Sequence, residues 1–166
     1  MTFIESSRPD VVMLHAFWNP PLDIAKLRGT VEALKAVPVR RIVLLGRTPV
    51  WDKRGLKQTA LNYYRFRGEL IPERIPAQPD DAATDHLMAS IAGQLGIEFI
   101  SARNPFCNPD GCLTRLGPSV LDLVATDQIH LTAKGSQFLI GAISAELFPG
   151  MARRTPGPDG GEPPQR

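Results

Sequence analysis

The sequence predicts an α/β domain built on a parallel sheet. Short apolar runs alternate along the chain with stretches whose apolar residues recur at helical spacing. The length of 166 residues is that of one ordinary domain, and a composition of 43% hydrophobic and 22% charged residues is typical of a chain with a core. Because right-handed crossovers put helices on both faces of a parallel sheet, we expect three layers.

Three apolar runs are the expected strands. Residues 11–18 form a nearly continuous apolar run, which is typical of a strand buried on both faces. The second strand is expected at 41–45 and the third at 97–100. Three strands are few for a parallel sheet, and nothing upstream covers the open edge of the first one. We therefore expect that the parent fold has one or two further N-terminal strands, or that this edge pairs with another chain.

Helices are expected between and after these strands. Helical spacing of apolar residues predicts them over 21–37, 56–67, 80–95 and 132–148. Pro21 suits a helix start, and Thr132 suits the N-cap of the last helix. Asp80 or Asp81 is a candidate cap for the third helix, which we expect to end at Gly96.

The expected domain covers residues 1–150, followed by a disordered Pro/Gly-rich tail at 151–166. Three prolines within 69–79 predict an irregular connection. The net charge is +2 and the basic residues are scattered, so nucleic-acid binding is not expected. With no apolar run of about 20 residues and no signal-peptide pattern, the sequence alone predicts a soluble chain without an export signal.

The two cysteines bracket a strong turn sequence. Cys107 and Cys112 flank Asn-Pro-Asp-Gly, whose residues favour a tight turn that brings the thiols together. One interpretation is a disulfide, which implies an oxidising compartment, and the other is two reduced thiols in a loop. A zinc site is disfavoured because none of the histidines, His15, His86 and His130, stands at ligand spacing from the cysteines. No metal and no cofactor is expected.

The segment just before the last expected helix carries the candidate chemistry. Asp127 precedes His130 by three residues in a turn, so its carboxylate can bind imidazole Nδ1 and leave Nε2 free to accept a proton. Thr132 as a helix cap and Gly135 as a site of close packing would hold His130 on a rigid segment at the start of the helix. The alternative interpretation is a solvated loop before a helix N-cap.

This segment resembles a known family. The motif Asp-x-x-His-Leu-Thr-x-x-Gly-Ser over 127–136 resembles the last conserved block of the SGNH (GDSL-like) ester hydrolases. The cysteine loop shortly before it is similar to that of the SGNH domains fused to the C-terminus of acyltransferase family 3 membrane proteins, which modify cell-surface glycans. Residues 9–14, which lead to Trp18, resemble the third-strand block of those domains. The resemblance spans roughly residues 9–148.

The resemblance implies a three-layer flavodoxin-like sandwich and a serine-type O-acyl esterase or O-acyltransferase that acts on cell-surface glycans. It implies that His130 is the catalytic base and Asp127 the acid that orients it. Asn19 lies near the place of the family's oxyanion donor, although Phe-Trp-Asn-Pro departs from the family's Gly-x-Asn-Asp. It also implies a disulfide between Cys107 and Cys112, a periplasmic or other extracytoplasmic location, and an upstream membrane acyltransferase domain or N-terminal half of the fold as partner.

The nucleophile of the family is missing from this sequence. It sits in a Gly-Asp-Ser motif after the first strand, and that motif does not occur here. Ser6 and Ser7 precede a strand instead of following one. We therefore expect a C-terminal portion of the domain that is inactive in isolation. The alternative is a non-catalytic remnant or interaction module, while a flavodoxin-like nucleotide binder is disfavoured because no Gly-rich loop follows a strand.

Four other residues have simpler interpretations. His15 lies in an apolar run and is expected to be a core histidine with its hydrogen bonds satisfied. His86 is expected on the solvated face of a helix. Trp18 and Trp51 follow two expected strands at the same edge, where they either line a pocket or pack in the core.

Overall fold

The computed structural model describes residues 2–20, 23–76, 78 and 80–149. The expected tail at 151–166 and the expected helix start at Pro21 lie outside these ranges.

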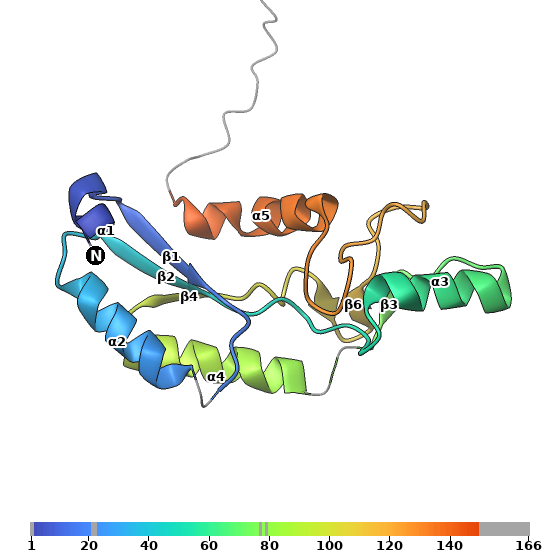
Figure 1. Ribbon diagram of the computed structural model, residues 1–166, viewed down its shortest axis with the longest axis horizontal. Helices are drawn as coiled ribbons and strands as arrows, with labels where there is room; N and C mark the ends of the chain where they lie inside the picture. The colour runs from blue at the N-terminus through green and yellow to red at the C-terminus, as the bar shows by residue number, and fades with distance from the viewer. Residues whose placement is uncertain (1, 21–22, 77, 79, 150–166) are drawn as a thin grey trace, which may run out of the picture.

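A three-stranded parallel sheet forms the centre of the molecule (Figure 1). Its strands are β1 (Val11–His15), β2 (Arg41–Leu45) and β4 (Glu98–Ile100), in the spatial order β1-β2-β4. Each strand falls within or next to one of the three apolar runs, and both pairings are parallel. The predicted α/β class with a parallel sheet is therefore confirmed.

Helices cover both faces of this sheet (Figure 1). Helix α5 (Ala133–Leu147) lies on one face, and α2 (Ile24–Lys35) and α4 (Asp80–Gln94) lie on the other. Alternate side chains of β2 point to opposite faces of the sheet, as in any β-strand. Val43 and Leu45 belong to the core that contains residues of α5, whereas Leu44 belongs to the core that contains residues of α2 and α4.

β1 differs from the sequence prediction because it is an edge strand. The central strand β2 buries four consecutive residues, from Ile42 to Leu45. β1 instead leaves Met13 and His15 exposed, and its outer edge has no partner within the described ranges. The expectation of a strand buried on both faces over 11–18 is therefore wrong, and the strand ends at His15.

The remaining elements lie around the ends of the sheet. Helix α3 (Leu56–Arg67) has the predicted bounds, and the short helix α1 (Thr2–Ser7), which the sequence did not predict, precedes β1. Strands β3 (Arg74–Ile75), β5 (Cys107–Asn108) and β6 (Gly111–Leu113) form a small antiparallel sheet in the order β3-β6-β5. These strands are too short to give a hydrophobic pattern, so the sequence indicated only an irregular connection and a loop.

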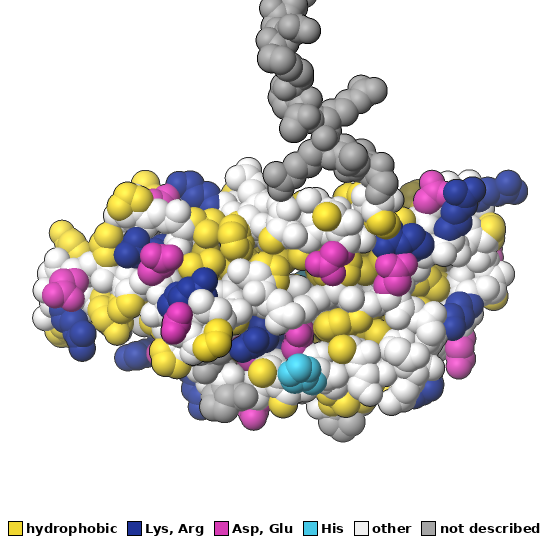
Figure 2. Space-filling model, turned by 180° about the vertical axis from the view of Figure 1, so that it is seen from behind, with side chains coloured by type: hydrophobic (Ala, Val, Ile, Leu, Met, Phe, Trp, Pro, Cys, Tyr) yellow, Lys and Arg dark blue, Asp and Glu magenta, His cyan; other side chains and the backbone are white. Residues whose placement is uncertain are grey.

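Charges of both signs are mixed on the surface. On the face shown in Figure 2, Lys and Arg side chains alternate with Asp and Glu side chains and with apolar ones. None of the helices in the described ranges is both long and apolar enough to span a bilayer.

A disulfide closes the hairpin between β5 and β6. Cys107 and Cys112 are directly paired residues of the two strands, and their sulfurs are bonded. The turn uses the predicted chemistry, since the Asn108 side chain accepts the N–H of Asp110 at 3.0 Å and Gly111 has a φ of 120°. A side chain at Gly111 would also collide with the carbonyl oxygen of Ile75 in β3.

Helix α5 is seated directly against the chain that precedes it. Thr132 caps the helix as predicted, because its Oγ1 accepts the N–H of Gly135 at 3.0 Å. The same hydroxyl donates to the carbonyl oxygen of Leu123 at 2.7 Å. A Cβ atom at Gly135 would lie 2.0 Å from the carbonyl oxygen of Val124, so only glycine fits there. The first turn of α5 therefore cannot shift without moving the segment that carries His130.

We expect the disulfide to contribute about 2 kcal/mol to the free energy of unfolding, because it closes a short loop in the unfolded chain. Urea unfolding with and without dithiothreitol measures this contribution. The double variant Cys107→Ser/Cys112→Ser cannot form the disulfide, so it should be as stable as the reduced wild type both with and without dithiothreitol. Equal midpoints for the oxidised and reduced chain would contradict the prediction.

Gly135→Ala should lower the free energy of unfolding by about 1 to 3 kcal/mol, because a backbone oxygen blocks the new methyl group. Gly141 of the same helix is the matched control, since a Cβ atom there meets nothing within 4 Å. Gly141→Ala should raise stability by about 1 kcal/mol through helix propensity alone. Unfolding of both variants at the same denaturant concentration would show that Val124 does not restrict the residue at position 135.

Candidate functional site

Asp127 and His130 form a closed turn immediately before α5. Asp127 Oδ2 lies 2.7 Å from His130 Nδ1. Asp127 Oδ1 accepts the backbone N–H groups of Ile129 at 2.9 Å and His130 at 2.8 Å. The N–H of Thr126 donates to the carbonyl oxygen of His130 at 2.9 Å and closes the turn. The carboxylate thus holds both the backbone and the imidazole of the histidine, and Nε2 is left free.

The hydrogen bonds in this turn keep the carboxylate ionised. The backbone N–H of His130, followed by that of Ile129 and by the imidazole, lowers the pKa of Asp127 to about 2. The side chains of Asp127 and His130 are 52% and 73% exposed, and an ion pair this open to water adds little stability. The geometry therefore depends mainly on the backbone amides.

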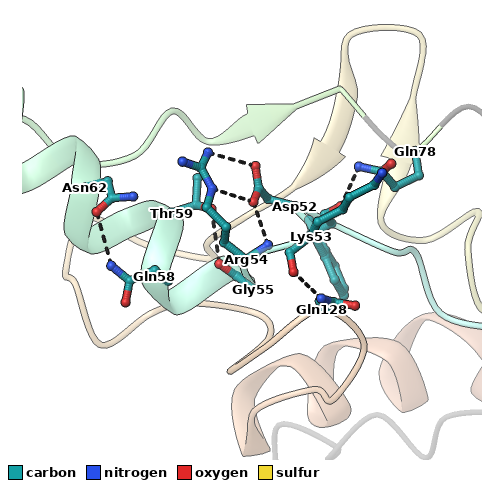
Figure 3. Close-up of polar contacts among 10 residues, drawn as sticks. Asp52, Lys53, Arg54, Gly55, Gln58, Thr59, Asn62, Gln78 and Gln128 are labelled. Atoms are coloured by element: carbon teal, nitrogen blue, oxygen red, sulfur yellow. Dashed lines mark hydrogen bonds and ion pairs between the residues drawn. The ribbon is translucent and has the colours of Figure 1, made fainter.

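The β2–α3 loop, residues 46–55, supports this turn from outside. Gln128 Nε2 donates to the carbonyl oxygen of Lys53, as Figure 3 shows. The N–H of Trp51 donates to the carbonyl oxygen of Gln128 at 3.2 Å, and Thr48 Oγ1 donates to that of Ile129 at 3.1 Å. Three successive bonds thus attach the loop to the turn.

The start of α3 completes this support. The N–H of Leu56 donates to the carbonyl oxygen of Asp127 at 3.1 Å, so Asp127 satisfies one of the free N–H groups at the helix start. Gly55 precedes the helix with a φ of 87°, and a Cβ atom there would lie only 3.0 Å from the Cα atom of Asp127. Asp52, one turn earlier in the loop, accepts the backbone N–H and the guanidinium of Arg54 (Figure 3).

A hollow of about 160 Å³ opens beside His130 at the carboxyl ends of β1 and β2. This edge is where open parallel sheets bind their ligands. The residues that line the hollow are His15, Ala16, Phe17, Arg47, Thr48, Ile129 and His130. Thr48 alone among them carries a hydroxyl, and that hydroxyl donates to Ile129. His130 thus faces the hollow and not the core around α5.

The expectation for His15 is wrong. The side chain is exposed at the end of β1, with its Nδ1 3.5 Å from the carbonyl oxygen of Leu45, and it lines the hollow together with His130. The physical reason is the position of β1 at the sheet edge, where His15 pairs with β2 on one side and, within the described ranges, no strand lies on the other. The sequence contained one signal, since His15 directly ends a strand on the ligand-binding edge. His86, by contrast, is exposed on α4 as expected.

Asn19 and His130 do not line the same hollow. Asn19 is exposed and lines a larger hollow of about 720 Å³, which also contains Lys53, Gln78 and Gln128. The two hollows share Phe17 and Arg47 as a common wall.

Both tryptophans pack in the core. Trp18 and Trp51 are 8% and 1% exposed, and neither lines the two hollows near His130. Their Nε1–H groups donate to the carbonyl oxygens of Leu45 and Leu113 at 2.9 and 2.8 Å. Of the two interpretations, core packing is therefore correct.

Ser6 and Ser7 lie in α1, before the amino end of β1, whereas the hollow lies at the carboxyl end. Ser6 Oγ donates to the carbonyl oxygen of Phe3 within that helix. Neither serine is available to His130 in this arrangement.

A largely buried ion pair that sequence reasoning missed joins Asp81 of α4 to Arg47 in the wall between the two hollows. Asp81 Oδ1 lies 2.7 Å from Arg47 Nη2, and Asp81 Oδ2 accepts the N–H of Val50 at 2.6 Å. The carboxylate therefore accepts hydrogen bonds from the β2–α3 loop and does not act as the predicted candidate cap of its own helix. Burial raises the pKa of Asp81, against the effects of the Val50 N–H and the Arg47 guanidinium.

Within the described ranges, no three His, Cys, Asp or Glu side chains gather closely enough to hold a metal ion.

Comparisons with known proteins agree with this architecture. The periplasmic domain of the lipopolysaccharide acetyltransferase from Salmonella ser. Paratyphi A is similar, with a TM-score of 0.79 and 29% sequence identity. The match covers 88% of this chain and 59% of that one, so this chain spans little more than half of the similar domain. A search of curated proteins found no match.

A family model described as the SGNH domain fused to AT3 domains matches residues 1–145. This match covers most of the chain and agrees with the fold and with the motif at 127–136. The chain therefore belongs to the family of SGNH domains that are fused to AT3 domains.

Proposed function

We propose that this chain supplies the acid–base half of an SGNH-type O-acyltransferase or esterase that acts on cell-surface glycans. The observation that carries the proposal is the Asp127–His130 pair beside the hollow at the carboxyl edge of the sheet. Family membership and the similarity to an acetyltransferase domain support acyl transfer as the reaction class.

His130 acts as the base in this proposal. Its Nδ1 is bound to Asp127, so Nε2 takes the proton of a serine hydroxyl as the serine oxygen attacks the acyl carbonyl carbon. The same proton then passes to the oxygen of the leaving group when the ester bond breaks. In the second half-reaction, Nε2 takes a proton from the glycan hydroxyl or from water and returns it to the serine. Asp127 remains ionised and stabilises the imidazolium in both halves.

The nucleophilic serine comes from a polypeptide segment that pairs with β1. The outer edge of β1 has no partner in the described part of the chain, and His15 at its carboxyl end lines the hollow. A parallel strand added at this edge would bring its own carboxyl end beside the hollow, where a following Gly-Asp-Ser turn meets His130.

The family description supports a source for the acyl group and a location for the domain. A membrane AT3 domain of the same protein or complex delivers the acyl group to an SGNH domain on the extracytoplasmic side, where the Cys107–Cys112 disulfide is stable. We assign no catalytic role to Asn19, because it lines the larger hollow and not the one beside His130.

A second candidate function is favoured by the same open edge. An exposed strand edge binds partners by adding a strand, and a chain without a nucleophile would serve as an interaction module. The two functions differ in one respect, since only the first requires His130.

The isolated chain should hydrolyse p-nitrophenyl acetate no faster than background, because the base has no nucleophile to activate. Restoring an upstream segment that bears Gly-Asp-Ser, in the same chain or as a partner, should produce turnover. In the restored protein, His130→Ala should lower kcat on the order of 10³-fold or more.

His86→Ala is the matched control for that variant, since His86 is exposed on α4 and lines neither hollow near His130. It should leave kcat unchanged. Turnover that survives His130→Ala would refute the assigned roles, and a restored protein that binds the segment without turnover would favour the interaction module.

Asp127 should titrate in the folded chain with a midpoint of about 2 instead of the ordinary 3.8. Because the folded-state pKa is lowered, the stabilisation from this turn is complete above about pH 4 and is lost as the pH falls toward 2. Carbon-13 NMR of the Asp127 carboxyl measures the midpoint, with Asp127→Asn to assign the signal. A midpoint near 3.8 would mean that the N–H groups of Ile129 and His130 do not bind this carboxylate in solution.

A further inference from the structure

We propose that Asp81 is a positioning residue for the site. Through the β2–α3 loop it holds both the His130 turn and the wall of the hollow beside His130. Only the kinetic consequence of this proposal rests on the proposed function. Each carboxylate oxygen of Asp81 makes one of two connections to the site.

The first connection runs from Asp81 Oδ2 to the His130 turn. Oδ2 accepts the N–H of Val50 at 2.6 Å. Val50 stands between Thr48 and Trp51, the two residues of the β2–α3 loop that bond to Ile129 and Gln128. Fixing the backbone at Val50 therefore fixes the two donors that hold the carbonyl groups of Gln128 and Ile129, the two residues directly before His130.

The second connection runs from Asp81 Oδ1 to the wall of the hollow. Oδ1 binds Arg47 Nη2 at 2.7 Å, and the guanidinium lies 5.0 Å from the centre of the Phe17 ring. Arg47 also donates to Thr84 at 3.4 Å. Arg47 and Phe17 form the wall that separates the hollow at His130 from the larger one, so Asp81 determines the position of this wall.

Burial makes the loss of either connection energetically unfavourable. The side chains of Asp81 and Arg47 are 2% and 14% exposed. Loss of the carboxylate would leave a largely buried guanidinium without its counter-charge and a buried N–H without its acceptor, and both are unfavourable. The β2–α3 loop would therefore rearrange to reach water, and Thr48 and Trp51 would move with it.

Stability alone does not account for this pair. Buried ion pairs are often replaceable by apolar residues without loss of stability, so their presence favours a role in fixing one arrangement. Both carboxylate oxygens of Asp81 bond outside its own helix, to Arg47 and Val50. Its bonds go to the β2–α3 loop, which is the element that contacts the His130 turn.

The test compares Asp81→Asn with Asp80→Asn in the full chain. Asp80 is the exposed neighbour of Asp81 at the start of α4 and is the matched control. NMR of the folded chain should show shifted or broadened signals for the amides of Val50 and Ile129 and for the His130 imidazole in Asp81→Asn. Asp80→Asn should leave all of them unchanged. An Asp81→Asn chain that unfolds at lower urea but keeps the wild-type His130 signals would overturn the proposal.

A double-mutant cycle with Thr48→Val tests the route. If Asp81 acts through Thr48, the effects of Asp81→Asn and Thr48→Val on the His130 signals should be clearly less than additive. Additive effects would overturn the proposed route through the β2–α3 loop. Thr48→Val is close in shape to the wild type, so it also serves if Asp81→Asn fails to fold, because the loss of its single bond to Ile129 should by itself shift the His130 signals.

Kinetics in the restored, nucleophile-bearing protein give the functional consequence. Asp81→Asn should lower kcat/KM about tenfold or more, with most of the loss in kcat, because a misplaced base reduces the rate of proton transfer. Asp80→Asn should match the wild type. Unchanged kcat in Asp81→Asn would overturn the positioning role. If the restored protein has no esterase activity at all, the proposed function fails, and the NMR comparison still decides the role of Asp81.

Discussion

The hydrogen bonds of Asp127 determine how the rest of the site is arranged. Its carboxylate accepts two N–H groups of its own turn and binds the imidazole, and its carbonyl oxygen accepts the first N–H of α3. Two residues after His130, Thr132 starts α5, whose first turn is locked against Val124 by Gly135. Asp127 thus links His130 to the start of α3, and Thr132 links the same turn to the start of α5, so the histidine is held by backbone contacts and not by the weak attraction of an exposed ion pair.

The parts of this structure that the sequence predicted are those that local chemistry decides. The bounds of α3, the cap at Thr132 and the turn between Cys107 and Cys112 each follow from residues a few positions apart. The two errors that matter for the site, at His15 and Asp81, have a different origin. Exposure of His15 depends on which strand lies next to β1, and the role of Asp81 depends on a loop more than 30 residues earlier in the chain. No local pattern contains that information.

The open edge of β1 and the exposure of His130 are two aspects of one arrangement. An apolar strand at a sheet edge is unfavourable unless something covers it, and an acid–base pair in water is a weak catalyst because solvent screens its charges. A single added strand would correct both, since it would pair with β1 and close the hollow at His15. The same physical argument holds whether the strand belongs to the same polypeptide or to a partner.

Apolar packing and polar contacts have different roles in this molecule. Two hydrophobic clusters on opposite faces of β2 hold the layers together, and one of them extends to the β2–α3 loop through Trp51. The carboxyl edge of the sheet is held by polar contacts instead, from Asp81 to Val50, from Thr48 to Ile129 and from Trp51 to Gln128. Apolar packing tolerates small shifts, whereas a buried hydrogen bond is lost when its partners separate by about an ångström. A site that must hold an imidazole to within a fraction of an ångström is therefore better built on the polar contacts, and the cost of burying Asp81 and Arg47 is the consequence of that precision.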